Sequence, residues 1–245
     1  MNRTRAVAAR VLHQLARDRR FLTLSVAAPL LVIYISKAAL DSFKVPFVDI
    51  SQFVIPIGAF IVHFATYILC AIVLVRERAA QTLARMFVNG YRQAEIIGGY
   101  VLAYTCLATL QSILVLGELS LLFHLNYSAK VLLSVYVVIW LLAVISICLG
   151  IFVSNFARNE GQVLPFIPLV TVPGIFLSDL IFPVSMFPRW TQWLSHATPL
   201  FYANQIIQRL IKDGTLAESW TRVATLVLYG AVVLFLAMRT LRESD

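Results

Sequence analysis

Charged residues are scarce in this sequence. Asp, Glu, Lys and Arg make up 13% of its 245 residues, whereas they make up about a quarter of a typical soluble domain. Intrinsic disorder requires high charge and low hydrophobicity, so this composition excludes a disordered chain. An ordinary soluble domain is excluded as well, because 60% of the residues are hydrophobic, more than one or two cores would bury.

The motifs of several chemistries are also missing. The sequence contains no G-x-x-x-x-G-K-[ST] phosphate loop, no H-E-x-x-H zinc motif and no G-x-S-x-G nucleophile elbow. Its four histidines are widely separated. Cys70, Cys106 and Cys148 lie in apolar stretches without metal-ligand or disulfide spacing, which indicates buried free thiols. We therefore expect no enzyme activity, no metal and no cofactor in this chain, and a membrane enzyme of lipid metabolism is disfavoured.

Apolar sequence is abundant, and the mean hydropathy is +0.84. About 20 apolar residues are needed to span the hydrocarbon core of a membrane. Pro165, Pro168 and Pro173 predict that one such stretch is a kinked or partly broken helix. Pro29 and Lys37 follow the first apolar run without a small-residue cleavage site, so we expect no cleaved signal peptide. The sequence predicts a single all-α transmembrane domain over 1–245, with six spans at 21–40, 52–75, 96–123, 131–153, 162–182 and 222–238.

The basic residues predict the orientation. The formal net charge is +8. Thirteen Lys and Arg residues lie on one side of the membrane: before the first span, in the connections on that side, and after the last span. Seven lie on the other side. The positive-inside rule then places both termini in the cytoplasm. Because topology accounts for the excess charge, we expect no nucleic-acid partner.

Two segments on the basic side have helical patterns of their own. Residues 5–20 place apolar residues on one stripe and Arg10, His13, Gln14 and Arg17 on the other, which predicts a helix lying flat in the inner membrane interface. The alternative is a partly disordered topology signal. Residues 77–88 form a second predicted helix, ended by Asn89-Gly90. Its apolar patch, with a charged rim, fits a groove on a partner protein, or alternatively the membrane surface. That patch consists of Leu83, Met86 and Phe87.

The long connection on the other side, 183–221, is too apolar for a solvated loop and too interrupted for a span. Trp and Tyr favour the headgroup level of a membrane, so we expect a re-entrant or interfacial hairpin over 183–214. A plain aromatic belt is an equally good interpretation. The candidate gate residues are Phe182, which directly precedes this connection, and Pro183, Met186, Pro188, Trp190, Trp193, Phe201 and Tyr202 within it.

A few polar side chains lie inside the predicted spans. Glu118 and Asp179 are candidates for a transport pathway, although solvation near the outer surface explains them as well. His63 is a candidate proton relay, with a hydrogen-bonded packing role as the stronger interpretation. Ser146, Gly150 and Ser154 form a small-xxx-small face, which packs either within the subunit or at a dimer seam.

The order of these elements is distinctive. The most specific residues are Arg76-Glu77-Arg78, Leu83 and Gly90, followed by Gly150, Ser154, Asn159, Gln162, Pro173, Ser178, Phe182-Pro183, Met186, Pro188, Trp190 and Pro199. With them, essentially the whole chain resembles the type-2 ABC exporter permeases. It departs from that pattern at Ala79-Ala80-Gln81 and at Ser178-Asp179, where the family often has glycine.

The resemblance implies a function. Residues 77–90 would be the coupling helix, with Arg76, Glu77, Arg78, Leu83, Met86, Phe87 and Gly90 as its coupling residues. It would dock on an ABC ATP-binding subunit, present in two copies, which holds ATP and Mg²⁺. Two copies of this chain, in a prokaryotic plasma membrane and among its lipids, would export a lipidic or drug-like amphipathic substrate. Alternatives are export of a polysaccharide or glycolipid precursor or an ion, and a self-sufficient secondary carrier or channel.

Overall fold

The computed structural model describes residues 3–43, 51–214 and 219–241, and these residues form helices and turns without a strand. Two helices precede the first uncertain segment: α1 (Arg3–Arg17) and α2 (Arg19–Phe43). The middle of the chain forms α3 (Ser51–Ala79), α4 (Thr82–Val88), α5 (Gln93–Leu122) and α6 (Ala129–Ser154). The last part forms α7 (Glu160–Val163), α8 (Phe166–Phe176), η1 (Val184–Met186), α9 (Arg189–Ser195), α10 (Pro199–Asp213) and α11 (Trp220–Thr240).

Five helices in the described part of the chain are long and apolar enough to span a membrane: α2, α3, α5, α6 and α11. The fifth predicted span, 162–182, is not one continuous helix. A turn at Leu164-Pro165 separates the single turn α7 from the eleven-residue α8, and both of these residues keep helical backbone angles. Proline has no backbone N–H, so the helical hydrogen bonding is interrupted where Pro165 predicts it.

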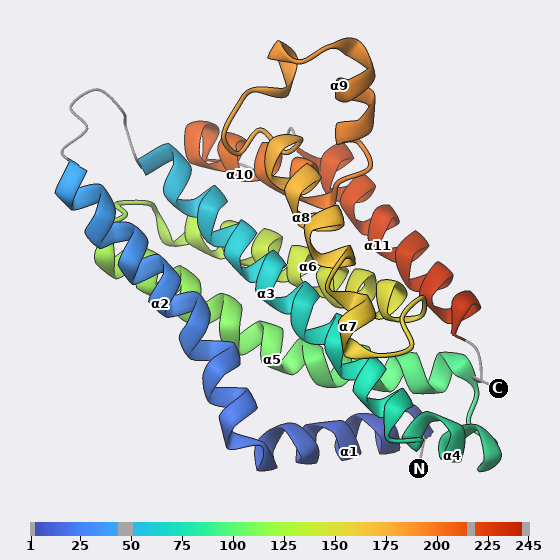
Figure 1. Cartoon of the computed structure of the whole chain (residues 1–245). Helices are drawn as coiled ribbons and strands as arrows, with labels where there is room; N and C mark the ends of the chain where they lie inside the picture. The colour runs from blue at the N-terminus through green and yellow to red at the C-terminus, as the bar shows by residue number, and fades with distance from the viewer. Residues whose placement is uncertain (1–2, 44–50, 215–218, 242–245) are drawn as a thin grey trace.

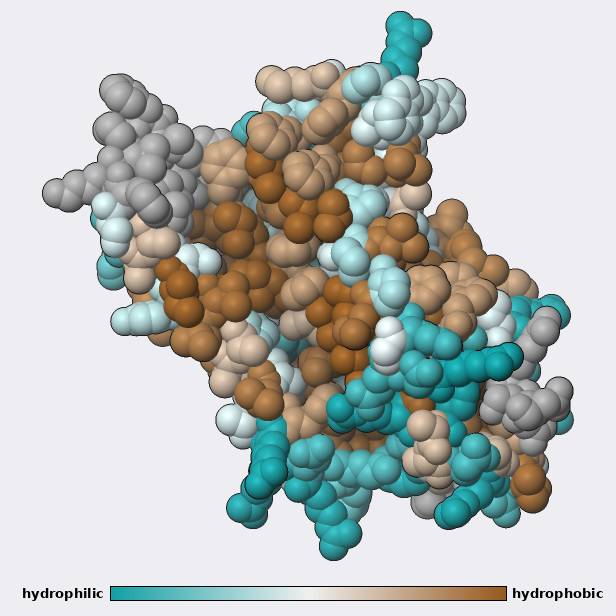
Figure 2. Space-filling view, in the orientation of Figure 1, coloured by the Kyte–Doolittle hydropathy of each residue, from teal (hydrophilic) through white to brown (hydrophobic). Residues whose placement is uncertain are grey.

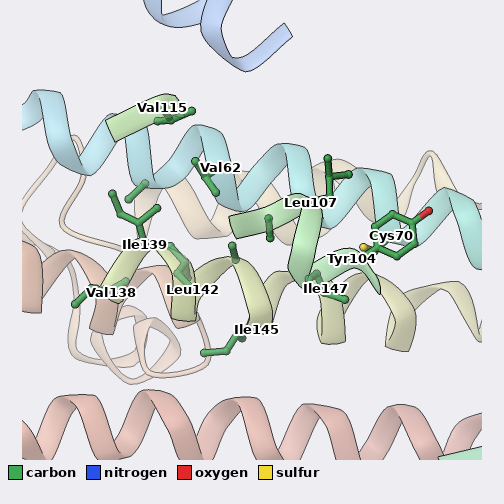
Figure 3. Close-up of a cluster of buried hydrophobic side chains, with 14 of the residues drawn as sticks. Val62, Cys70, Tyr104, Leu107, Val115, Val138, Ile139, Leu142, Ile145 and Ile147 are labelled. Atoms are coloured by element: carbon green, nitrogen blue, oxygen red, sulfur yellow. The ribbon is translucent and has the colours of Figure 1, made fainter. Parts of the chain in front are cut away.

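The core is built around α6 (Figure 1). Of the apolar stretch of α6, 67% is buried, whereas 17% is buried in α2 and in α11. Side chains of α3, α5 and α6, among them Val62, Leu107 and Leu142, interdigitate along this axis (Figure 3). α2 and α11 therefore present most of their apolar surface outward. One thiol was predicted wrongly, because Cys106 of α5 is exposed while Cys70 and Cys148 are buried.

Glycine allows α3 and α6 to approach closely. A Cβ atom added to Gly150 would lie 2.6 Å from the carbonyl oxygen of Tyr67 and 2.9 Å from the backbone nitrogen of Ala71. No side chain fits there without moving the backbone of α3. Ser146 and Ser154 are fully buried on the same face of α6. The small-residue face thus packs within the chain, which decides between the two predicted alternatives.

α1 runs across one end of the bundle and meets α2 at a corner (Figure 1). Asp18 lies between the two helices, and its Oδ1 accepts a hydrogen bond of 3.0 Å from the backbone N–H of Phe21. This is the usual role of an N-cap aspartate. Val7, Val11 and Leu15 are buried, so the predicted apolar stripe faces α5, and the helix ends at Arg17, before the predicted end at residue 20.

Candidate functional site

The bundle has two chemically different ends. The first, which we call the basic end, contains α1, α4, α7, the last turns of α3, α6 and α11 and the first turn of α5. Hydrophilic side chains gather there, while apolar ones dominate the middle of the molecule (Figure 2). The second, which we call the aromatic end, consists of residues 177–214, that is, η1, α9, α10 and the loop before them. The residues predicted to carry function lie at both ends.

Three consecutive side chains at the basic end, Arg76, Glu77 and Arg78, diverge from the last turn of α3. Successive residues of a helix point about 100° apart, so each reaches a different neighbour. Arg76 Nε donates to Glu160 of α7 at 2.8 Å. Glu77 pairs with Arg10 of α1, and Arg78 reaches the end of α6. The motif therefore joins α3 to three other elements.

Arg78 satisfies the end of α6. Its Nη1 donates to the carbonyl oxygens of Ser154, at 2.9 Å, and Ala157, at 2.5 Å. Carbonyls at a helix C-terminus have no partner within the helix and carry partial negative charge, so a guanidinium stabilises them. Asn155 extends the network, because its Nδ2 donates to the carbonyl oxygen of Ala237 at 3.0 Å. The ends of α3, α6 and α11 are thereby fixed to one another.

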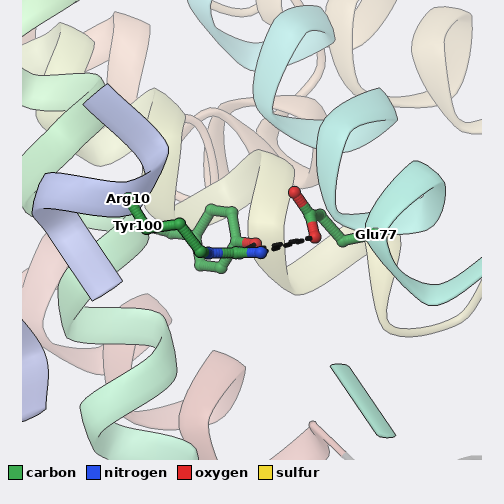
Figure 4. A network of polar contacts seen from close by, with 3 residues as sticks. All are labelled: Arg10, Glu77 and Tyr100. Carbon is green, nitrogen blue, oxygen red and sulfur yellow. Dashed lines mark hydrogen bonds and ion pairs between the residues drawn. The ribbon is translucent and has the colours of Figure 1, made fainter. Parts of the chain in front are cut away.

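The pair between α1 and α3 includes a third residue (Figure 4). Arg10 Nη1 and Nη2 each donate to Glu77 Oε2 at 3.4 Å, and Nη2 donates to Tyr100 Oη of α5 at 2.6 Å. Arg10 was predicted on the outward face of its helix, and this was wrong. It points inward because the carboxylate of Glu77, 67 positions away, is its partner, and no local sequence signal reports such a partner.

The predicted apolar patch of residues 77–88 faces inward. Leu83 is 3% exposed and Met86 is 8% exposed, and both belong to the core, with Phe87 packed against it. These side chains are therefore not a free surface for a partner. The predicted helix also starts later, since Gln81 adopts φ 57° and separates α3 from α4. On its outer side α4 exposes Val88, at 83%, with Gln81, Arg85 and Asn89.

The turn after α4 agrees with the prediction. Gly90 has φ +76°, a conformation that favours glycine. Its carbonyl oxygen accepts a hydrogen bond from Arg3 of α1, whose guanidinium also lies over the Tyr91 ring. Two further residues of the resemblance have local roles: Asn159 caps α7 by accepting from the backbone of Gln162 at 3.0 Å, and Gln162 Oε1 accepts from the backbone of Arg158.

At the aromatic end, Asp179 organises the chain. It has φ 56°, and its Oδ1 accepts from the backbone N–H of Val184 at 2.6 Å. Gln205 and Gln208 of α10 donate to its carboxylate and carbonyl oxygens at 3.4 and 3.2 Å. Asp179 was predicted as a candidate pathway residue, and these contacts make it a positioning residue for η1 and α9.

The predicted gate residues divide into two groups. Met186, Trp190 and Trp193 are 70–79% exposed, and Phe182, Pro183 and Pro188 are also exposed. Phe201, in contrast, is buried and stacks on His196, with ring centroids 5.3 Å apart. Tyr202 is half-buried; burial raises the pKa of its phenol, which donates to the carbonyl oxygen of His196 at 3.2 Å. Only the first group forms a free apolar surface.

Several polar side chains within the spans bond across helices. His63 Nδ1 lies 2.6 Å from Ser146 Oγ, joining α3 to α6. Gln111 of α5 accepts from Thr66 of α3 and donates to the backbone of Ser25 in α2, both at 3.1 Å. Glu118 differs, because its buried Oε2 has no hydrogen-bond partner among the described residues. Within the described residues no group of three or more His, Cys, Asp or Glu side chains is placed to hold a metal ion.

Comparisons with known proteins agree on one family. The family model described as ABC-2 type transporter matches residues 2–211. ABC transporter G family member 20 of Dictyostelium discoideum is 23% identical over 198 residues, covering 79% of this chain and 27% of that protein. A probable multidrug ABC transporter permease of Escherichia coli strain K12, YbhR, is 24% identical over 76% of this chain and 51% of its own length.

A third relative, the linearmycin resistance permease protein LnrN of Bacillus subtilis strain 168, is 24% identical over 154 residues, covering 63% of this chain and 40% of its own. The chain thus spans about half, or less, of the length of these curated relatives.

Proposed function

Because this chain belongs to the ABC-2 type transporter family, we propose that it is the transmembrane subunit of an ATP-driven exporter whose ATP is hydrolysed by a separate ABC subunit. The observation that carries the proposal is the network at the basic end. Arg76, Glu77 and Arg78 tie α3 to α1, α6 and α7 directly ahead of α4. A displacement of α4 therefore reaches several spans at once.

In this proposal α4 is the coupling helix. Its inner side chains, Leu83 and Met86, lock it to the core, so that it moves with the spans. Its outer residues, Arg85, Val88 and Asn89, would meet the ATP-binding subunit. Closure of two such subunits on ATP would then shift the bundle as a rigid body. The Mg²⁺ and ATP belong to that partner in this proposal.

The proposal also includes a membrane topology. The basic end faces the cytoplasm under the positive-inside rule, with both termini there, in a prokaryotic plasma membrane. α7 and α8 together would provide the fifth crossing in chain order, in addition to the five long helices. The 17 residues Glu160–Phe176 have a helical length of about 25 Å, close to the thickness of the hydrocarbon core. The aromatic end would lie at the outer leaflet as a gate, and α1 would lie in the inner interface.

A second copy of the chain completes the machine in this proposal. One copy supplies one coupling helix, while closure of two ATP-binding subunits needs two. The outward apolar faces of α2 and α11 offer surface for lipid and for that second copy. The cargo would be lipidic or amphipathic, in keeping with the name of one relative, a probable multidrug ABC transporter permease.

The test is transport by the reconstituted complex. Inside-out vesicles that contain this chain and its ATP-binding subunit should accumulate a fluorescent amphipathic dye when ATP is supplied. Accumulation driven by an ion gradient in vesicles with this chain alone would contradict the proposal and favour a secondary carrier.

Docking is tested separately on the outer side of α4. Val88→Asp should abolish co-purification of the ATP-binding subunit without unfolding the chain, because this side chain is 83% exposed. Leu83→Asp is not an equivalent test, since it would bury a charge in the core. The matched control is Leu194→Asp, at an exposed position of α9 at the other end of the bundle and outside the predicted spans. Normal assembly with Val88→Asp would contradict the docking surface.

A further inference from the structure

α11 runs along α6 and connects the aromatic end of the bundle to the basic end (Figure 1). The side that it turns toward the bundle is one apolar stripe, in which Leu226, Val233 and Ala237 are buried. Apolar contact is non-directional, so the stripe alone does not fix the position of α11 along its own axis. Hydrogen bonds at the two ends of the helix supply that constraint, and each end is bonded to a different part of the molecule.

At the basic end, α11 is bonded to the network that surrounds α4. Asn155, the C-cap of α6, donates to the carbonyl oxygen of Ala237 at 3.0 Å. Its side-chain oxygen accepts from Arg78 of α3 at 3.5 Å. Gln93, the first residue of α5, donates to the carbonyl oxygen of Leu241 at 2.6 Å. A displacement of the basic end therefore acts directly on this end of α11.

At the other end, α11 is bonded twice to the aromatic end. Arg222 Nε donates to Gln205 Oε1 of α10 at 2.7 Å. The amide of Gln205 in turn donates to the carboxylate of Asp179, which is the acceptor for η1. Tyr229 Oη donates to the carbonyl oxygen of Ala197, between α9 and α10, at 2.9 Å. The two bonds therefore act on the chain just before η1 and just after α9.

Between these two sets of bonds, α11 is one uninterrupted helix. From Arg222 to Ala237 it rises about 22 Å. Sharp kinks in helices occur at proline, at Gly/Ser pairs or at π-bulges, and α11 has none of these. The direct chain connection from the basic end to residue 177, through α7 and α8, is in contrast interrupted at Leu164-Pro165. α11 is therefore the continuous helix that is bonded to both networks.

We propose that α11 transmits movements of the basic end to the aromatic end, and that Arg222 and Tyr229 are positioning residues for η1 and α9. This deepens the proposed function, on which it rests only for the statement that the aromatic end is a gate. A purely structural role would hold η1 and α9 in place in the same way whether or not Asn155 is bonded to α11. Transmission makes the two sets of bonds depend on each other.

The experiment measures hydrogen exchange of the backbone amides of 184–196 by mass spectrometry, on the full chain in nanodiscs. Asn155→Ala releases α11 at the basic end. The outer variant, Arg222→Met with Tyr229→Phe, releases it from the aromatic end. Each should speed exchange by about fivefold or more, because a lost hydrogen bond favours local opening.

The combination of the inner and outer changes decides the proposal. They act on α11 at points about 22 Å apart, and changes at such a separation normally have independent effects. Transmission through α11 predicts that adding Asn155→Ala to the outer variant speeds exchange no further. Multiplied effects would overturn the proposal, and so would unchanged exchange in the outer variant.

Two controls keep the result specific. Tyr136→Phe removes a hydroxyl of α6 that has no bond to a described residue, and it should leave exchange in 184–196 unchanged. Exchange within 131–153 reports the stability of the core, and if Asn155→Ala raises it, Gln93→Leu replaces that variant. The assay needs no ATP-binding subunit. If the coupling is found but ATP drives no transport, the proposed function fails and the connection through α11 stands.

Discussion

The two ends of the bundle differ in how they are held together. At the basic end, guanidinium groups bond to carboxylates and to helix carbonyls, and the bonds connect α1, α3, α6 and α7, with Asn155 adding α11. At the aromatic end, Asp179 in a left-handed turn accepts two bonds on its carboxylate, from Val184 of η1 and Gln205 of α10, and one on its carbonyl oxygen from Gln208. Charge-assisted bonds therefore occur at both ends, but those of the basic end connect several helices, whereas those of Asp179 connect one short turn to α10. We therefore expect the basic end to move as a unit and the aromatic end to open locally.

The largest effect is expected from Arg78→Ala. The change removes the donor of the Ala157 carbonyl and one of the two donors of the Ser154 carbonyl, which also accepts from the backbone N–H of Ala157, at a cost of about 2–3 kcal/mol. The thermal midpoint of the purified chain, followed by size-exclusion chromatography after heating, should fall clearly. Arg158→Ala is the matched control, because this exposed side chain makes no bond to a described residue. Equal stability of the two variants would mean that the basic end is not held by this network.

A smaller effect is expected for the pair of Arg10 and Glu77. The nitrogen and oxygen atoms lie 3.4 Å apart, and the two side chains are 32% and 12% exposed, so screening limits the coupling to about 1 kcal/mol. A double-mutant cycle with Arg10→Met and Glu77→Gln measures it from denaturant unfolding. Additive single effects would show that the pair of Arg10 and Glu77 does not help to hold α1 on the bundle.

Asp179→Ala tests the aromatic end. Loss of the acceptor for Val184 should free η1 and α9, with a local cost of about 1 kcal/mol and little change in the global midpoint. Limited chymotrypsin digestion measures local opening, because Trp190 and Trp193 are exposed cleavage sites. Asp179→Asn keeps an acceptor oxygen and is the control. A fall in the global midpoint as large as that of Arg78→Ala would erase the difference between the ends.

The smallest effect on stability is expected from Trp190→Ala and Trp193→Ala. Both side chains are at least 70% exposed, so each change should stay within about 0.5 kcal/mol. Dye export by the complex should nevertheless change if these rings form a gate. Trp220→Ala, at an exposed tryptophan of α11, serves as the control. Export unchanged in all three variants would leave the rings as an aromatic belt.

Patterns with a local cause were predictable from the sequence. The length of the apolar stretches predicted the five long helices, and the prolines predicted the interruption between α7 and α8. The pair Asn89-Gly90 predicted the turn after α4. Each of these depends on residues within one helical turn or one span. The family resemblance, carried by Arg76-Glu77-Arg78 and by the later proline-rich block, is confirmed by the family model.

Long-range partners were not predictable. The seven residues of α4 have one apolar face, and the sequence does not say whether a partner protein or the rest of the chain covers it. In the structure, Leu83 and Met86 are buried in the core of the chain itself. Helical periodicity predicted Arg10 on the outward face of its helix, but its partners, Glu77 and Tyr100, are 67 and 90 positions away in the sequence. The apolar cleft of about 480 Å³ between α2 and α3 was also missed, because it depends on how far apart two helices lie, which no residue pattern encodes.

The first and last described residues both contact the segment where α5 begins. Arg3 bonds to Gly90 and lies 3.9 Å from Glu95, and the carbonyl oxygen of Leu241 accepts from Gln93 at 2.6 Å. Any domain fused through a short linker to either terminus would therefore be held next to α4. Tethering of this kind produces effective concentrations in the millimolar range, so even a weak docking surface would stay occupied. A peptide tag at either terminus would also lie next to α4. Assembly experiments must therefore control the length of the tag.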